Sequence, residues 1–522
     1  MRAAPTSTNR YLGLAVVCAG VFVMVIDNTV LNIALVALSK DLGASNSELQ
    51  WIVDAYTLLY AGVMLTAGAL GDRFGRARSF WWGSLTFGIA SATAAFATSS
   101  ATLIACRAAM GICAAFVTPA TLSIITNLFT DPVERGRGIA IWAAVASSGA
   151  AAGPVVGGIL VDHFWWGSVF LVNVPVVIAI LICVPLFVPE SKNPNPSKLD
   201  LVGAVLSTAA LTTLLWATID APERGWTSPT ILGAYALSAS LLTAFWWWEP
   251  TSHHPMLELK FFAARAFSVA TAANSMTILA GIGMNYVLSL TLQGVLGYSP
   301  FEAGIRLAPF AVMNALMGFM SHRLTGFMGR WRVIMLGLIV QTAAAVALLG
   351  FHRDSGYLTL FVMMMAFSGG QALVFAPGVA SAMAAVPKER STVASAANNT
   401  LRQTAVAFGV AIMGSVLASG YRARLDTSGT AAGLDAATLS EASRSLGHAS
   451  RLSAELPTDQ GSQLLDVARN SFMHGVHLAT YVAILTCAIG LVVAWRWLPR
   501  DHRDTGVPVE SLSDPTSTPD AV

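Results

Sequence analysis

Two carboxylates of this 522-residue chain lie inside hydrophobic stretches, where a charge is expensive. Asp27 falls in the stretch 11–36, and Asp54 falls in the stretch 51–70. An ionised side chain at the centre of a membrane-spanning helix costs about 2.5–3.5 kcal/mol on insertion scales. Such a residue is kept for a cationic partner, a transported proton or a cationic ligand, and Arg107, in a third apolar stretch, is the candidate partner.

The pairing of Asp27 with Arg107 is suited to proton coupling. Attraction to the arginine favours the ionised carboxylate, and burial disfavours it. A cavity that opens and closes would change this balance, as a proton-coupled carrier requires. Two structural alternatives stay open: Asp27 caps polar neighbours such as Asn28 and Thr29, or it pairs permanently with Arg107. Asp54 is a second candidate for proton coupling, and its structural alternative is that it lies close enough to its span end to reach the interface.

Aromatic and neutral polar residues complete the candidate substrate site. Tyr56 and Tyr60 follow Asp54 on the same stretch, and tyrosine faces bind organic cations by cation–π contacts. The last six apolar stretches contain no deep carboxylate, so we expect Asn314 and Gln403 to contribute only hydrogen bonds. Asp27 and Asp54 would supply the charge that attracts a cationic substrate.

Composition indicates the elements that carry these residues. The chain is 55% hydrophobic and 11% charged, whereas soluble domains contain about 25% charged residues. Since backbone groups must be satisfied in lipid and no alternating β pattern is visible, we expect an all-α polytopic membrane protein. Fourteen stretches are long enough to span a bilayer: 11–36, 51–70, 79–98, 101–125, 138–160, 168–188, 200–219, 230–249, 267–290, 303–321, 331–350, 357–384, 392–418 and 472–497.

Several function classes are excluded by what the sequence lacks. The net charge of +2 and the absence of a basic stripe argue against nucleic-acid binding. No GxxxxGK[ST] loop indicates ATP-driven transport, and the five cysteines lack metal-ligand spacing. No soluble domain or nucleophile–base arrangement supports an enzyme. We expect no metal site and no cofactor.

Positive charges predict the orientation. With Met1 in the cytoplasm, 19 of the 30 lysines and arginines fall in inner segments and eight in outer segments. This bias predicts that both termini are cytoplasmic. The alanine-rich composition fits the cell (inner) membrane of a bacterium. We expect the one long outer loop, 420–470, to be a solvated cap.

An internal duplication predicts the domain organisation. Gly111–Pro119 and Gly369–Pro377 share the same Gly-to-Pro spacing, and each precedes a PxER tetrapeptide, at 132–135 and 387–390. Their positions predict two six-helix repeats, spans 1–6 and 9–14, with spans 7 and 8 inserted, as in alternating-access carriers. The predicted units are a bundle at 1–190, an inserted segment at 191–266, a second bundle at 267–500, and a disordered cytoplasmic tail at 501–522.

Two glycine-containing motifs accompany the buried charges. Between spans 2 and 3, the order G-x-L-G-D-R-x-G-R gives a tight turn with its own ion-pairing residues: Gly71, Asp72, Arg73, Gly75 and Arg76. In span 5, small residues leave room for close helix packing, and a proline favours a kink: Gly149, Gly153, Pro154, Gly157 and Gly158. We expect the first motif to hold the outward-open state and the second to form the surface on which the halves rock.

These motifs resemble those of the major facilitator superfamily, and G-x-x-x-G-P-x-x-G-G resembles the pattern of its antiporters. Further stretches are similar to the fourteen-span drug:proton antiporter family: Val25–Leu35, Trp51–Tyr56, Trp165–Pro175, Tyr298–Pro309 and Ala394–Gln403. Many members have a small polar residue where this chain has Asp54. An acid there resembles the subgroup that exports quaternary ammonium compounds and other drugs.

The resemblance implies a proton-coupled multidrug efflux antiporter that works by alternating access. Its partners would be amphipathic, cationic small molecules, protons and the lipid bilayer, and it would function as a monomer. Two alternatives remain: export of an endogenous antibiotic or metabolite, and proton-coupled import. The Gly153-Pro154 motif argues against import.

Overall fold

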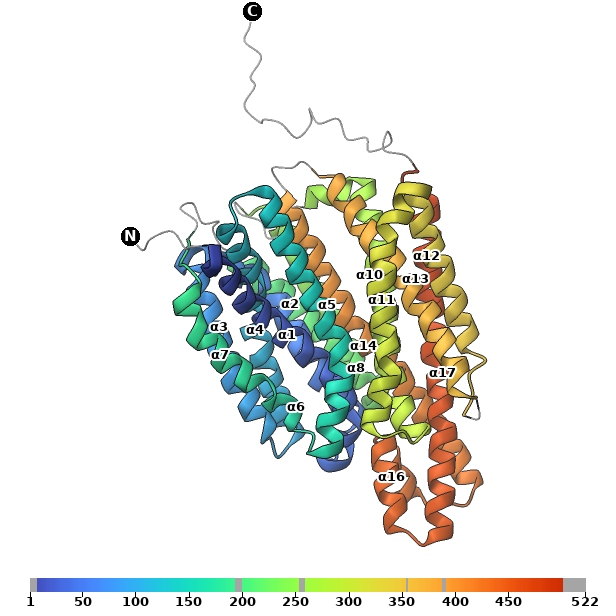
Figure 1. The fold of residues 1–522 in the computed structure, drawn as a ribbon. Helices are drawn as coiled ribbons and strands as arrows, with labels where there is room; N and C mark the ends of the chain where they lie inside the picture. Colours follow the sequence, from blue (N-terminus) through green and yellow to red (C-terminus); the bar gives the residue numbers. More distant parts are fainter. Residues whose placement is uncertain (1–6, 193–199, 253–258, 354, 387–390, 501–522) are drawn as a thin grey trace, which may run out of the picture.

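The computed structural model describes residues 7–192, 200–252, 259–353, 355–386 and 391–500. Within these ranges the chain is helical and contains no strand, which confirms the predicted all-α class (Figure 1). The predicted tail at 501–522 and the second PxER tetrapeptide at 387–390 lie outside the described residues. The helices are α1 (Ser7–Asp41), α2 (Asn46–Phe74), α3 (Arg76–Ala95), α4 (Ser100–Leu128), α5 (Pro132–His163), α6 (Ser168–Leu171), α7 (Asn173–Phe187), α8 (Leu201–Arg224), α9 (Pro229–Trp248), η1 (Leu259–Ala263), α10 (Arg265–Leu290), η2 (Thr291–Val295), α11 (Pro300–Met328), α12 (Arg330–Leu348), α13 (Tyr357–Ala384), α14 (Ser391–Ala431), α15 (Ala436–Ala442), α16 (Leu446–Glu455) and α17 (Thr458–Trp497).

The helices identify a multi-pass membrane protein. Twelve described helices are long and apolar enough to cross a membrane, and the bent α2 adds a thirteenth if its two parts form one span. Each of the fourteen predicted ranges coincides with a helix, but α3 does not meet the same test because serine, threonine, glycine and tryptophan dilute its aliphatic residues. The count of fourteen spans stays a prediction.

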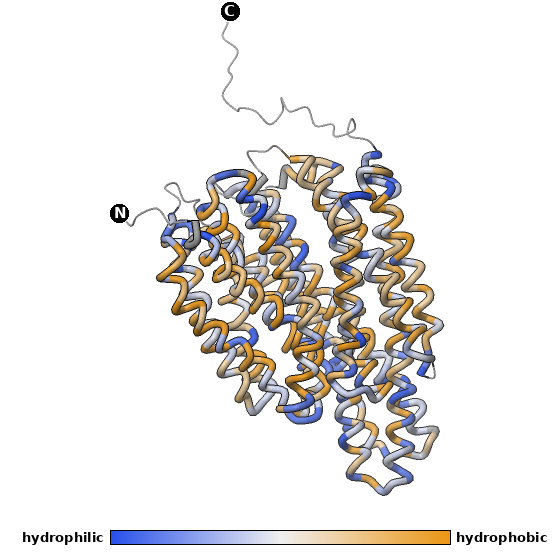
Figure 2. The backbone as a smooth tube through the Cα atoms, viewed as in Figure 1, coloured by the Kyte–Doolittle hydropathy of each residue, from blue (hydrophilic) through white to orange (hydrophobic). Residues whose placement is uncertain are grey.

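Hydropathy follows the bilayer pattern along the helices (Figure 2). Apolar residues cover the helix bodies, and polar residues gather near both ends of the bundle. Large apolar side chains are exposed on outer faces, among them Ile182, Trp247 and Leu485. In water such a surface would be unfavourable, and in a membrane it faces lipid.

The helices pack as two groups. In the first, α1 packs on α4, α5 and α7, α2 packs on α4, and α3 packs on α4 and α7. In the second, α10 packs on α13, α14 and α17, α11 packs on α13, and α12 packs on α13 and α17. α1 begins and α17 ends at one end of the bundle, here called the terminal end; the opposite end, near α16, is called the cap end (Figure 1).

Polar contacts join the two groups near the cap end. Ser289 of α10 donates to the carbonyl of Asn32 in α1 at 2.6 Å. Gln293 of η2 donates to the carbonyl of Ile33 at 3.1 Å. Because these donors reach backbone carbonyls, the contact requires the two helices to approach closely.

The α14–α17 connection is more than the solvated cap that the sequence predicts. It folds into α15 and α16, and α16 packs on α1 of the other group. The hydroxyls of Ser445 and Ser39 lie 2.6 Å apart, and the amide of Asn46 donates to the carbonyl of Arg444 at 3.0 Å. The segment therefore covers the corner between α1 and α2.

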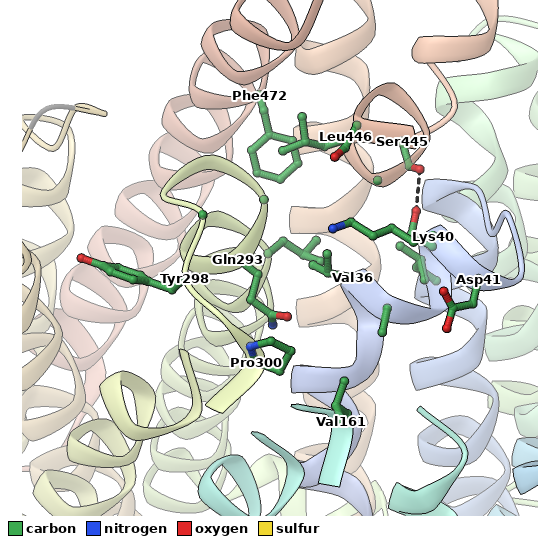
Figure 3. A pocket seen from close by; sticks show the side chains of 18 of the residues that line it. Val36, Lys40, Asp41, Val161, Gln293, Tyr298, Pro300, Ser445, Leu446 and Phe472 are labelled. Carbon is green, nitrogen blue, oxygen red and sulfur yellow. Dashed lines mark hydrogen bonds between the residues drawn. The ribbon is translucent and has the colours of Figure 1, made fainter. Parts of the chain in front are cut away.

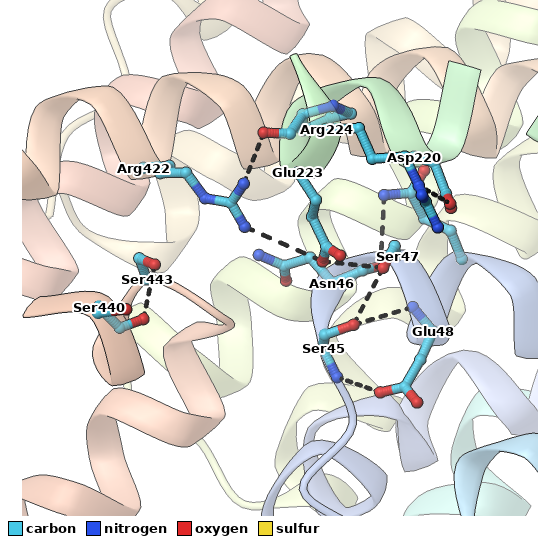
Figure 4. A network of polar contacts seen from close by, with 12 residues as sticks. Ser45, Asn46, Ser47, Glu48, Asp220, Glu223, Arg224, Arg422, Ser440 and Ser443 are labelled. Atoms are coloured by element: carbon cyan, nitrogen blue, oxygen red, sulfur yellow. Dashed lines mark hydrogen bonds and ion pairs between the residues drawn. The ribbon is translucent and has the colours of Figure 1, made fainter. Parts of the chain in front are cut away.

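The inserted helix α8 also contacts both groups, packing on α2 and α14, whereas α9 packs on α8. At the end of α8, Glu223 accepts a hydrogen bond from Ser47 at 2.9 Å (Figure 4). Arg422 of α14 donates to the carbonyl of Pro222 at 2.5 Å and lies 3.9 Å from Glu223. The C-terminal end of α8 thus forms polar contacts with both groups.

Glycines of α11 offer a matched test of the packing between groups. A Cβ on Gly304 would collide with the carbonyl oxygen of Pro154 in α5, whereas a Cβ on Gly318 meets nothing within 4 Å. We predict that Gly304→Ala lowers the free energy of unfolding by about 1–3 kcal/mol, as overpacking does. Gly318→Ala should raise it by up to about 1 kcal/mol, since alanine favours the helix.

Thermal unfolding of the two purified variants in detergent measures this difference. Equal midpoints for the Gly304 and Gly318 variants would contradict the close approach of α5 and α11.

Candidate functional site

Asp27 is buried in the first group of helices and has two hydrogen-bond donors. Nη1 of Arg107 lies 2.6 Å from its Oδ2, and Nδ2 of Asn173 lies 2.8 Å from its Oδ1. Only 2% of Asp27 is exposed. The alternative in which Asp27 caps local polar groups is wrong, because its partners come from α4 and α7, and Thr29 donates to carbonyls of its own helix.

Arg107 is fully buried and is held by α2 as well as by Asp27. Its Nε donates to the carbonyl of Ile52 at 3.0 Å, and its Cζ lies 4.4 Å from the ring centroid of Tyr56. The ring of Tyr60 is near-parallel to that of Tyr56, with centroids 6.1 Å apart. Both predicted tyrosines are buried, and Tyr56 stacks on the arginine of this chain. The Nη2 of Arg107 has no hydrogen-bond partner in the described part of the chain.

Asn173 connects this pair to a wider network. Its Nδ2 also lies 3.1 Å from Oγ of Ser91, which donates to the carbonyl of Phe170 at 2.8 Å. The network therefore draws on α1, α2, α3, α4 and the start of α7. The sequence predicted the pair but gave Asn173 and Ser91 no role, because a neutral amide at a helix start carries no signal of its own.

Asp54 lies in a different environment. α2 begins at Asn46, eight residues earlier, so Asp54 is about 12 Å into the helix at 1.5 Å per residue. It is completely buried, and neither carboxylate oxygen has a hydrogen-bond partner within the described ranges. The structural alternative in which Asp54 reaches the interface is therefore wrong, because the helix starts earlier than the hydropathy pattern predicted.

The face of α2 that carries Asp54 is directed toward the second group. Gln50, one turn earlier, accepts a hydrogen bond from Ser415 of α14 at 3.1 Å. A buried carboxylate without donors is unfavourable unless it binds a proton or a cation.

The predicted substrate residues of the second group do not join this cluster. Asn314 in α11 and Gln403 in α14 are half-buried, and neither side-chain amide forms a hydrogen bond within the described part of the chain. On α14, Arg402 donates to Asn399 at 2.6 Å, and Asn399 donates to the sulfur of Met64 at 3.1 Å.

The turn between α2 and α3 has its expected internal ion pair and one unexpected partner. Nε of Arg76 lies 2.7 Å from Oδ1 of Asp72. Gly75 has a φ of 125°, a backbone conformation that favours glycine. Glu190, after α7, accepts hydrogen bonds from the amides of Ala77 at 3.1 Å and Arg78 at 3.2 Å. The sequence did not indicate Glu190, because it lies more than one hundred residues away from its partners.

The small residues of α5 allow two helices, α1 and α11, to approach it closely. Side chains added to Gly149, Gly153 or Gly157 would meet α1, whereas one added to Gly158 would meet the backbone at Phe301 of α11. The motif around Pro154 therefore packs within one group and between the groups. It is positioned to permit movement, but its role in the transport cycle stays a prediction.

A cavity of about 490 Å³ lies between the groups at the cap end. Figure 3 shows Lys40 pointing into it from α1, with Gln293 and Phe472 on the opposite walls. The buried Asp27 and Asp54 do not line it. No group of three or more His, Cys, Asp or Glu residues that would suit a metal ion occurs among the described residues.

Comparison with known proteins identifies similar chains. Residues 17–410 match the family model described as the Major Facilitator Superfamily. The chain is 34% identical over 489 residues to the multidrug efflux pump LfrA of Mycolicibacterium smegmatis, covering 94% of this chain and 96% of the relative. It is 33% identical to the methyl viologen resistance protein SmvA of Salmonella typhimurium, covering 92% and 97%.

Another relative is the tetracenomycin C resistance and export protein of Streptomyces glaucescens, at 28% identity over 92% of this chain and 90% of the relative. Among solved structures, a bacterial homolog of the lysosomal transporter Spinster, inward-facing and occupied, superposes with a TM-score of 0.71. The identity is 16%, and 97% of this chain and 100% of that chain are covered. This likeness supports the fold alone.

The buried ion pair generates a stability prediction. Asp27→Leu or Arg107→Met alone leaves one buried charge unpaired, so each should lower the free energy of unfolding by about 3–5 kcal/mol. The double variant leaves no charge and should lose less than the sum of the two. The exposed pair Arg353–Asp466, 2.9 Å apart, is the control, and the corresponding changes there should each cost about 1 kcal/mol or less.

Thermal unfolding of all six variants measures both cycles. An Asp27–Arg107 double variant whose loss equals the sum of its single losses would contradict a coupled buried pair.

Proposed function

The chain belongs to the major facilitator superfamily, and we propose that it exports amphipathic, cationic compounds in exchange for protons. It is a transporter and not an enzyme. Relatives over nearly its whole length are named as multidrug efflux and resistance proteins, which supports drug export. The observation that carries the proposal is the completely buried Asp54, whose oxygens have no hydrogen-bond donor in the described part of the chain.

Asp54 suits exchange because one carboxylate can be neutralised in two ways. A bound proton removes its charge, and a bound organic cation balances it. The two ligands exclude each other at one site, so entry of the cation would release the proton. The position of Asp54, one turn after Gln50 on the helix that packs on α14, supports a role between the groups.

Asp27 and Arg107 would form the coupling centre. The pair is closed at 2.6 Å, with Asn173 on the second oxygen. A movement of α4 or α7 relative to α1 would change these contacts and hence the affinity of Asp27 for a proton. A permanent structural pair is the competing role, and the efflux assay below separates the two.

We also propose the complete layout of fourteen spans. Adding α3 and the bent α2 to the twelve helices that meet the length and apolarity test gives fourteen. Similar packing supports the two repeats: α3 lies against α4 and α7, as α12 lies against α13 and α17. The proposed units keep the predicted bounds, 1–190, 191–266 and 267–500.

The proposed orientation places the terminal end in the cytoplasm. The first described helix begins and the last one ends at this end (Figure 1), as an even number of spans requires. The excess of lysine and arginine in these segments supports the same assignment. Because most of the polar contacts between the groups lie near the cap end, with Asn399–Met64 as an exception, we propose an inward-facing conformation, in which the cap end is the closed outer side.

A second candidate function is export of an antibiotic made by the same organism. The similarity to the tetracenomycin C resistance and export protein supports it specifically. It shares the proposed mechanism and differs in cargo. Deleting the gene in its native host decides between the two: accumulation of one endogenous compound favours this candidate, and sensitivity to many added cations favours multidrug export.

The coupling role predicts the behaviour of Asp27→Asn. We expect this variant to lose ethidium efflux driven by a proton gradient, because its side chain cannot bind and release a proton. Protein level and thermal midpoint should be matched to the wild type, and Thr29→Val provides a control on the same helix. Undiminished efflux by a stable Asp27→Asn protein would refute the coupling role.

Proton release in inverted vesicles tests the direction of exchange. Addition of a transported cation should dissipate a preformed proton gradient in an antiporter. An importer would instead move substrate and proton the same way.

The substrate role predicts selective effects of Asp54→Asn. Loss of a charged partner should raise the apparent Kd of a monovalent organic cation by roughly 10–100-fold, for an interaction worth about 1.5–3 kcal/mol. Binding of a neutral substrate should change little. Thr57→Val, which removes a buried hydroxyl one turn further along α2, is the matched control.

Fluorescence titration of the purified proteins with charged and neutral ligands measures this selectivity. Equal losses for both ligand classes would show that Asp54 supports the fold and does not recognise charge.

A further inference from the structure

Two turns of the molecule each lead into a helix that has no side-chain N-cap. The α2–α3 turn passes through Gly75, with a φ of 125°, and the α11–α12 turn passes through Gly329, with a φ of 85°. In each case the next helix begins at an arginine, Arg76 or Arg330, and the glycine offers no side-chain cap. The first amides of α3 and α12 therefore need acceptors from elsewhere.

The first turn has a carboxylate in this position. Glu190 accepts hydrogen bonds from the amides of Ala77 and Arg78, and its Oε2 lies 3.7 Å from Nε of Arg78. It stands three residues beyond Phe187, the last residue of α7. An anion at a helix N-terminus is favoured both by the free amides and by the helix dipole.

The second turn has a cation in the corresponding position. α12 packs on α17 as α3 packs on α7, and the residue three beyond Trp497, the last of α17, is Arg500. The Cζ of Arg500 lies 5.2 Å from the ring centroid of Trp331. The correspondence between Glu190 and Arg500 rests on the proposed duplication, whereas the cavity beside α12 is independent of it.

A cavity of about 300 Å³ occupies the space beside the start of α12. Arg330 and Arg500 line it, and neither forms an ion pair within the described part of the chain; Arg330 reaches only the carbonyl of Ala380, at 3.5 Å. The buried Nε1 of Trp331, also on the wall, has no hydrogen-bond partner there either. Two cations and an unpaired indole N–H thus line one cavity, and among the described residues only the carbonyl of Ala380 accepts from them.

The surroundings of this cavity are those of a membrane interface. It lies at the terminal end, where α10 begins and α17 ends. Three large aromatic residues that are close in sequence to the lining residues are exposed: Phe327 to 89%, Trp495 to 55% and Trp497 to 48%. Aromatic side chains of this kind concentrate at the level of lipid headgroups.

We propose that this cavity binds the phosphate group of an anionic phospholipid headgroup. Arginine forks match phosphate oxygens in pairs, and the indole and the first amides of α12 supply further donors. Basic pockets between spans at this depth suit anionic headgroups. The lipid phosphate takes the place that Glu190 occupies in the first turn.

The test compares lipids on the full-length protein in nanodiscs. Phosphatidylglycerol should raise the midpoint of thermal unfolding by about 2–4 °C relative to phosphatidylcholine alone, as a ligand that binds only the folded state does. Arg330→Gln and Arg500→Gln should each reduce this rise, and the double variant should lack it. Arg332→Gln, an exposed arginine of the same turn that does not line the cavity, should keep it.

A charge reversal gives a second test that does not depend on losing stability. Arg500→Glu places a carboxylate where Glu190 stands in the first turn. This variant should be stabilised in phosphatidylcholine alone and should no longer respond to phosphatidylglycerol. Native mass spectrometry should show one retained phosphatidylglycerol fewer than on the wild type.

Inorganic phosphate separates the two sources of the group. In detergent without added lipid, millimolar phosphate that reproduces the full rise would support the site and assign it to free phosphate. No rise with phosphate, together with a rise with phosphatidylglycerol, supports the lipid. A phosphatidylglycerol response that persists in both the double variant and Arg500→Glu overturns the proposal.

Discussion

The interaction on which the first group of helices depends is the burial of an ion pair inside a membrane protein. Asp27 and Arg107 are removed from water almost completely, so each needs the other and further donors to offset the loss of hydration. Asn173, the carbonyl of Ile52 and the ring of Tyr56 provide the rest. The four helices α1, α2, α4 and α7 must keep a fixed rotation about their axes for these groups to meet, and a change at the pair is therefore felt by all four.

Asp54, on the neighbouring helix, has the same side chain as Asp27 but a different hydrogen-bonding environment. It is as deeply buried as Asp27, but no donor reaches it within the described residues. A carboxylate with two donors is stable as an ion, whereas one without donors favours a bound proton or cation. This contrast supports assigning coupling to Asp27 and exchange to Asp54.

The two groups are joined by close backbone packing and by hydrogen bonds between side chains and backbone. Gly158 and Gly304 let the backbones of α5 and α11 approach, and Ser289 and Gln293 add hydrogen bonds from α10 and η2 to α1. The helix α16 and the end of α8 add polar links between the groups near the same end. In the proposed orientation these contacts lie where an outward opening would have to begin, so their strength would set how readily the two groups separate.

The sequence by itself determined the helices and the charged candidates. Hydropathy along the chain is a local property, and it located every long helix, the Asp72–Arg76 turn and the Asp27–Arg107 pair. The tertiary structure decided the full burial of Asp54, the partners Asn173 and Glu190, and the docking of α16 on α1. These depend on how each helix is rotated and which face meets which neighbour. Small residues and amides far apart in the chain set that rotation together, and no local pattern records it.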